Sequence, residues 1–260
     1  MILPFQLWFL FLFAGPLGIL VVMSFFARNE FGVAVPAFSF SSYRELLDPI
    51  YLQIIGRTLG LAFANTLSCI LIAYPLAFYF SRLPKRRAAT YLAIVMIPFW
   101  TNFLIRILAF LDVLRMTAPF GFNFIYTLPG VLLAMIYNYL PFAILPLYTS
   151  LEKIDTALIE AALDLGASRW QIIWRILWPM SRTGVLSAGA LVFIPSMGEF
   201  LIPDLVGGGQ KFFVGTFLYH QFFVARNWPL GAAAIVTLIL TASVGLGLVR
   251  WALALRPANR

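Results

Sequence analysis

The sequence is poor in the residues that build catalytic and metal sites. Its 260 residues include one cysteine, Cys69, and one histidine, His220. A disulfide within the chain needs two cysteines, and a His-rich metal site needs several histidines, so both are excluded. Only 11% of the residues are charged, and Glu199 is the one acid inside a long apolar run. We therefore find no paired acids, Ser–base pair or His cluster for an intramembrane enzyme.

The chain is instead rich in apolar residues, which make up 62% of the sequence. A soluble domain of this length does not need so much apolar surface, so the composition indicates an integral membrane protein. The formal net charge is +8. The basic residues are scattered between the apolar runs, which fits a membrane topology better than a nucleic-acid surface.

Six apolar segments are long enough to cross a bilayer as helices. They cover residues 5–26, 52–80, 88–111, 128–150, 183–202 and 230–254. We expect one all-α membrane domain over residues 1–260. Five prolines inside these apolar segments favour bends, at Pro75, Pro98, Pro141, Pro146 and Pro195. Outside the spans, Ser42 to Glu45 predicts a short helix beginning with a capping box, and residues 212–224 predict an interfacial or re-entrant helix.

Lysine and arginine set the orientation of the spans. Eleven basic residues fall on one side: Arg82, Lys85, Arg86, Arg87, Lys153, Arg169, Arg175, Arg182, Arg250, Arg256 and Arg260. Six fall on or near the other: Arg28, Arg44, Arg57, Arg115, Lys211 and Arg226. The richer side is predicted to be cytoplasmic. An even number of spans then places both termini in the cytoplasm.

One polar segment, residues 152–179, interrupts the apolar sequence and holds four of the ten acids. Asp155 is suited to cap a helix, and Gly166 to end it in a left-handed conformation. Ser168 with Gln171 predicts a capping box at the start of the next helix. The first helix has a predicted apolar face made of Ile154, Leu158, Ala161, Ala162 and Leu165.

This segment resembles the EAA loop of permease subunits in ABC importers. The matching residues are Glu160, Ala161, Ala162, Gly166, Ile176 and Pro179, and Trp178 stands where the pattern has leucine. The resemblance implies six transmembrane helices of the type I importer kind. It also implies that Glu160, Ala161, Ala162 and Gly166 form a cytoplasmic coupling helix that docks on an ATPase. The alternative is an ordinary loop helix that packs its apolar face on its own protein.

Polar groups inside the spans are candidates for function, because they are costly in lipid. Arg106 and Glu199 both fall in the outer half of their spans, and they either form a structural ion pair or serve transport. The cluster of Tyr137, Asn138 and Tyr139 lies near the middle of its span, as does Trp100. Aromatic faces and a carboxylate suit a passing organic cation, so these four residues and Glu199 are the candidate substrate path.

Four further segments are similar to permeases of spermidine and putrescine importers. They are Ile97–Arg106, Leu151–Asp155, Ser196–Leu205 and Arg226–Gly231. The resemblance implies a transport subunit in the bacterial inner membrane, without enzymatic activity or a cofactor of its own. ATP and Mg²⁺ would bind a partner ATPase dimer. The other implied partners are a second permease, in a heterodimer, and an extracytoplasmic binding protein. The alternatives are an importer for another small organic solute and, more remotely, an enzyme or a channel.

Overall fold

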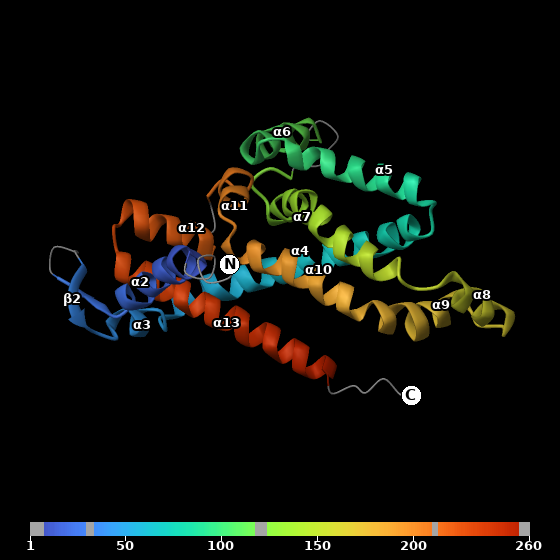
Figure 1. Ribbon diagram of the computed structural model, residues 1–260. Coiled ribbons are helices and arrows are strands. Elements are labelled where there is room, and N and C mark those ends of the chain that lie inside the picture. Colours follow the sequence, from blue (N-terminus) through green and yellow to red (C-terminus); the bar gives the residue numbers. More distant parts are fainter. Residues whose placement is uncertain (1–7, 30–33, 118–123, 210–212, 255–260) are drawn as a thin grey trace. The chain divides into compact units, whose positions relative to one another are not determined.

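The computed structural model describes residues 8–29, 34–117, 124–209 and 213–254, and most of these are helical (Figure 1). Two compact units divide the chain: residues 1–58 with 212–260 form the first, and residues 59–211 form the second. Both chain ends lie outside the described residues. So do residues 5–7 of the first predicted span and the basic residues Lys211, Arg256 and Arg260.

The first unit is built on its last helix. Its elements are η1 (Leu10–Ala14), α2 (Gly15–Met23), β1 (Phe26–Arg28), β2 (Ala34–Phe38), α3 (Ser41–Glu45), the start of α4 (Pro49–Ser81), α12 (Val214–Tyr219), η5 (His220–Val224) and α13 (Trp228–Ala254). The two strands pair antiparallel, and α13 packs against α2 and α3. The helix α3 starts at Ser41 without a side-chain cap, so the predicted capping box of Ser42 and Glu45 is wrong.

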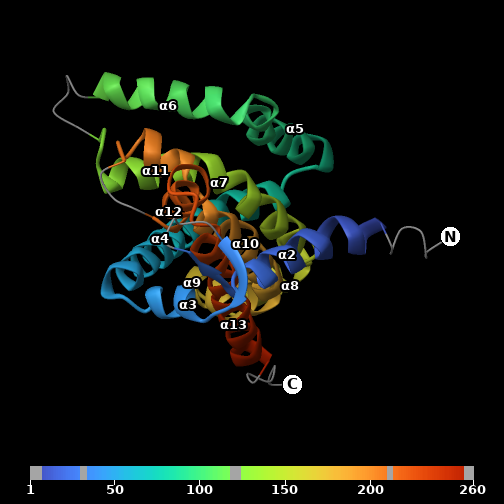
Figure 2. The ribbon, with the colours of Figure 1, turned by 90° about the vertical axis from the view of Figure 1, so that its left-hand side faces the viewer.

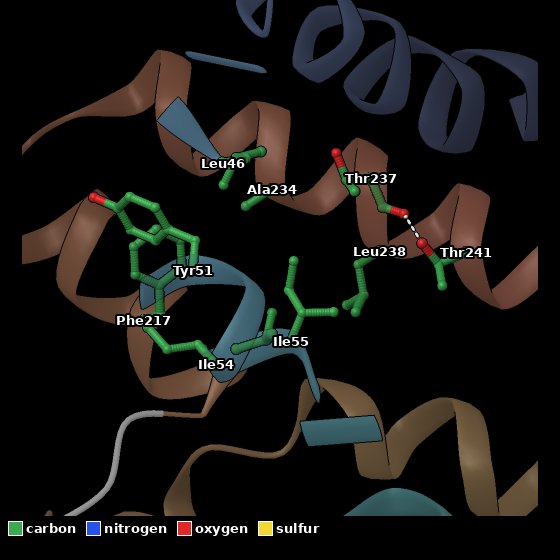
Figure 3. A pocket seen from close by; sticks show the side chains of 10 residues that line it. Leu46, Tyr51, Ile54, Ile55, Phe217, Ala234, Thr237, Leu238 and Thr241 are labelled. Carbon is green, nitrogen blue, oxygen red and sulfur yellow. Dashed lines mark hydrogen bonds between the residues drawn. The ribbon is translucent and has the colours of Figure 1, made fainter. Parts of the chain in front are cut away.

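Apolar side chains from α3, α4, α12 and α13 form the core of this unit. They include Leu46, Ile54, Val214, Phe217, Leu230, Ala233 and Ala234. The hydroxyl of Thr58 accepts a hydrogen bond from the backbone N–H of Val214 at 2.8 Å, which fixes the start of α12. Figure 3 shows a pocket among these side chains, bordered by Tyr51, Leu238 and Thr241. Its water-accessible volume is about 10 Å³, room for about one water molecule, so it holds no organic solute.

The second unit contains the remaining helices. They are the rest of α4, then α5 (Lys85–Met96), η2 (Ile97–Trp100), α6 (Phe103–Thr117), α7 (Leu128–Leu151), α8 (Thr156–Asp164), α9 (Arg169–Ile172), η4 (Ile173–Leu177), α10 (Trp178–Gly198) and α11 (Leu201–Leu205). Its central feature is the pairing of α7 with α10, which lie side by side (Figure 1). The pair packs closely at Gly184, where a Cβ atom would collide with Ser150 and with the carbonyl of Pro146.

Two hydrogen bonds tie α4 to α10 within this unit. The amide of Asn65 donates to the hydroxyl of Ser196 at 2.8 Å. The hydroxyls of Tyr74 and Ser181 are 2.9 Å apart. Both α10 hydroxyls also donate to carbonyls one turn back, so these buried polar groups are satisfied inside the bundle.

Most of the predicted spans match helices of the described chain. Four are long and apolar enough to cross a membrane: Pro49–Ser81, Leu128–Leu151, Arg169–Gly198 and Trp228–Gly245. The first predicted span corresponds to a shorter apolar helix, Leu10–Met23, which ends before Phe26 because the chain enters β1. The fifth predicted span ends at Gly198 instead of residue 202. The segment 212–224, predicted as an interfacial or re-entrant helix, is helical as α12 and η5.

The third predicted span, 88–111, is not a straight helix. It consists of α5 with η2, followed by α6, and the two parts meet at an angle of 97°. Figure 2 shows α6 following α5 as a separate helix. Thr101 is extended at the break, with ψ of 154°. Asn102 then restarts the helix, because its side-chain oxygen accepts from the N–H of Leu104 at 2.9 Å. Counting this bent pair as one span gives five, and the helix Leu10–Met23 would complete the predicted six.

Candidate functional site

The predicted polar segment folds as a short helix with a defined start and end. Asp155 caps α8 by accepting from the N–H of Ala157 at 3.0 Å. At the other end Gly166 has φ of +80°, as predicted. The N–H groups of Gly166 and Ala167 donate to the carbonyls of Leu163 and Ala162, which is the Schellman arrangement. The direction of the chain after α8 therefore depends on a conformation that glycine adopts at little cost.

The next helix also begins as predicted. The hydroxyl of Ser168 accepts from the N–H of Gln171, and the side chain of Gln171 accepts from the N–H of Ser168 at 2.7 Å. This helix does not end at Ile172. It runs through a π turn, Ile173–Leu177, into α10, and Pro179 lies in the first turn of α10, where its missing N–H costs little. The segment after α8 is therefore mechanically continuous with a transmembrane helix.

The surface of α8 is uncovered. None of its residues is buried, and Leu158 and Leu163 are 48% and 49% exposed. Leu165, directly after the helix, is 89% exposed. Only Ile154 of the predicted apolar face is buried, because it precedes the helix and packs into the unit. The alternative in which α8 packs on its own protein gains no support from this arrangement.

Arg106 does not use Glu199 as its partner in the described part of the chain. Its Nε donates to Oδ1 of Asn138 at 2.7 Å, and its Nη1 donates to the carbonyl of Pro98 at 2.9 Å. The guanidinium lies over the rings of Phe99 and Phe103, at 4.6 and 5.5 Å from their centroids. The side chain thus holds the bend between α5 and α6 against α7.

Glu199 is bound by neutral donors. It is buried, and it lies in extended backbone just after α10 instead of inside a span. Its Oε2 accepts from the hydroxyl of Tyr139 at 2.8 Å. Its Oε1 accepts from the N–H groups of Leu201 and Ile202 at 3.0 and 3.3 Å. The predicted ion pair of Arg106 with Glu199 is therefore not formed in the described chain. Arg106 binds Asn138 and Glu199 binds Tyr139, and these two partners are consecutive residues of α7.

The remaining path candidates are dispersed. Trp100 is 86% exposed at the bend, and Tyr137 stacks on Phe110 with ring centroids 5.0 Å apart. Asn138 and Tyr139 are buried. Asn138 faces Arg106 and Tyr139 faces Glu199, so the four residues do not form one cluster.

Sequence reasoning did not identify a polar pocket between α7 and α10. It has a volume of about 320 Å³ and is lined by Thr149, Ser150, Lys153, Thr183 and Ser187, among others. The signal in the sequence is the spacing of Thr183 and Ser187, which places two hydroxyls one turn apart on the same face of α10. A second missed residue is Arg82, which bonds the backbone between α7 and α8.

Comparison with known proteins gives consistent matches over most of the chain. The family described as "Binding-protein-dependent transport system inner membrane component" matches residues 1–258. The spermidine/putrescine transport system permease protein PotB of Escherichia coli (strain K12) is 35% identical over 241 residues, covering 88% of this chain and 87% of that protein. PotB of Haemophilus influenzae is 33% identical over 245 residues, covering 89% and 85%.

Solved structures share the fold at lower identity. A chain of a bacterial ABC transporter involved in the import of the acidic polysaccharide alginate has a TM-score of 0.72 and 19% identity, and the match covers 99% of this chain and 94% of that chain. A chain of the MetNI methionine ABC transporter has a TM-score of 0.55, covering 79% and 93%.

Proposed function

The chain belongs to the family of binding-protein-dependent transport system inner membrane components, and we propose that it is the permease subunit through which an ATP-driven importer carries spermidine and putrescine into the cell. The observation that carries the substrate class is the identity of 33–35% to PotB proteins over nearly the whole chain.

A buried acid supports a cationic substrate. Glu199 keeps its carboxylate among a tyrosine hydroxyl and two backbone N–H groups, without a direct cationic partner in the described chain. An ammonium group that leaves water needs such a carboxylate and aromatic faces. We place Glu199 and Tyr139 on the substrate path. Trp100, Tyr137 and Asn138 remain candidates for this path. The side chain of Asn138 is bound by Arg106.

The coupling role is assigned to α8. None of its residues is buried, Leu158 and Leu163 are about half exposed, and Asp155 and Gly166 cap its two ends. Glu160, Ala161 and Ala162 lie on this helix, and Gly166 sets its exit. A cytoplasmic ATPase groove would bury Leu158 and Leu163. The continuous helix Arg169–Gly198 would carry the resulting movement into the membrane.

The complete transporter needs partners that this chain does not supply. We propose a second permease of the same fold, a dimer of ATPase subunits that binds ATP and Mg²⁺, and an extracytoplasmic binding protein. A related solved complex contains a periplasmic protein bound to an alginate pentasaccharide. In the proposed topology α8 and both termini are cytoplasmic, because most basic residues flank that side.

Two matched substitutions test the coupling surface. Ala161→Trp adds a large ring to exposed α8, whereas Ala89→Trp adds the same ring to an exposed position of α5. We expect Ala161→Trp to lower ATPase co-purification and uptake of radiolabelled spermidine, with the permease pair still assembled. Ala89→Trp should keep both. Equal uptake and co-purification in the two variants would contradict docking through α8.

A further inference from the structure

Arg82 occupies the junction between three helices of the second unit. It follows directly after the last residue of α4. Its Nη1 donates to the carbonyl of Ile154 at 2.9 Å, and its Nη2 donates to the carbonyl of Leu151 at 3.3 Å. Leu151 ends α7, and Ile154 directly precedes Asp155, the capping residue of α8. One side chain therefore contacts both ends of the connection between these helices.

Arg82 binds one carbonyl at the end of α7 and one in the turn that follows it. The Leu151 carbonyl also accepts from the N–H of Ile154 at 3.2 Å. The last carbonyls of α7 have no intrahelical donor, and a cation near a helix C-terminus is favoured by the helix dipole. Leu151 and Ile154 are both buried, so water has little access to the turn. A planar guanidinium holds its N–H groups in a fixed fork that spans two separated acceptors, whereas an ammonium places its three donors on one compact, rotatable group.

An aromatic ring and a carboxylate lie close to the Arg82 guanidinium. It lies over the ring of Phe78 on α4, with 5.1 Å between Cζ and the ring centroid. Burial lowers the pKa of the Arg82 guanidinium, and the nearby carboxylate of Asp155 acts in the opposite direction. Arginine nonetheless stays charged at neutral pH. The Arg82 guanidinium thus contacts a ring of α4, the last carbonyl of α7, and a carbonyl in the turn before α8.

We propose that Arg82 is the positioning residue that fixes the base of the coupling helix to the end of α4. The role rests on the proposed function of α8, which docks on the ATPase. The caps of α8 are independent of Arg82, because Asp155 and Gly166 supply them. Loss of the guanidinium therefore leaves α8 helical and frees its direction. Movement of α8 then no longer passes fully to α4.

Three variants separate this role from general stability. Arg82→Gln removes both carbonyl bonds of the guanidinium, and Arg82→Lys keeps the charge but replaces the planar fork with a single ammonium. Arg86→Gln is the control, because it removes a charge from an exposed position of the same basic segment. The readouts are spermidine uptake per ATP hydrolysed in the reconstituted transporter, and the distance between spin labels at Tyr79 and Glu160 in a Cys69→Ala background.

We expect Arg82→Gln to broaden the distance distribution and to lower the uptake per ATP in assembled complexes. Arg82→Lys should restore part of both, and Arg86→Gln should match the parent. The distance measurement needs no transported solute, so it stands even if the polyamine assignment fails. A parent complex that takes up no polyamine contradicts the proposed function alone. An unchanged distance distribution in Arg82→Gln overturns the role of Arg82.

Discussion

Removing the guanidinium of Arg106 should destabilise the permease through the lost contact with Asn138, because Glu199 does not bind Arg106 directly. In Arg106→Gln the carbonyl of Pro98 keeps the hydroxyl of Thr101, which donates to it at 2.6 Å. Oδ1 of Asn138 loses the donor that reached it at 2.7 Å. A hydrogen bond to a charged group contributes about 1.5–3 kcal/mol. The ring contacts with Phe99 add about 0.5–2 kcal/mol.

The expected cost of Arg106→Gln is therefore about 3 kcal/mol in the free energy of unfolding. Two double-mutant cycles identify the partner: one combines Arg106→Gln with Asn138→Ala, and the other combines it with Glu199→Gln. Residues that bond directly couple by about 0.5–3 kcal/mol. The assay is denaturant titration of the purified permease in detergent. We expect the larger coupling energy in the Asn138 cycle, and a larger value in the Glu199 cycle would refute the reasoning.

Three further predictions concern the loop, the acid and the topology. A side chain at φ of +80°, the conformation of Gly166, costs about 1–2 kcal/mol. Gly166→Val should therefore lower ATPase co-purification, whereas Gly166→Asn should retain it because asparagine tolerates this region. Equal ATPase binding by both variants would count against the role of the glycine. Glu199→Gln keeps a hydrogen-bonding side chain but loses its charge, so polyamine uptake should fall in assembled complexes, and unchanged uptake would remove the acid from the path. In a Cys69→Ala background, cysteines at Lys85 and at the exposed Leu47 should label with an impermeant reagent from opposite sides, and labelling of both from outside would disprove the topology.

The features that depend on a few neighbouring residues were predictable from the sequence. Asp155, Gly166 and the pair of Ser168 with Gln171 each act on backbone within one turn, so the sequence contains all of their partners. The lengths of the long spans follow from hydropathy for the same reason. The short helix at Ser41 shows the limit of this approach, because a capping pattern was present but the helix began one residue earlier.

The pairing of distant groups was not predictable. Helical rise placed Arg106 and Glu199 at similar depth, but it gave no information on which side of each helix they face. Their partners, Asn138 and Tyr139, are 32 and 60 residues away in the chain. The 97° bend had a signal in Asn102, a residue type that favours helix starts, but the hydropathy continued across it.

Uptake driven by ATP is the most direct test of the account as a whole. The chain is reconstituted into vesicles with its partner permease, ATPase and binding protein, and radiolabelled spermidine is supplied on the side of the binding protein. We predict accumulation of spermidine that requires ATP, is competed by putrescine and is lowered by Ala161→Trp. ATP-dependent accumulation of a neutral sugar or an anion, with no accumulation of spermidine or putrescine, would contradict the assignment of this chain as a polyamine permease.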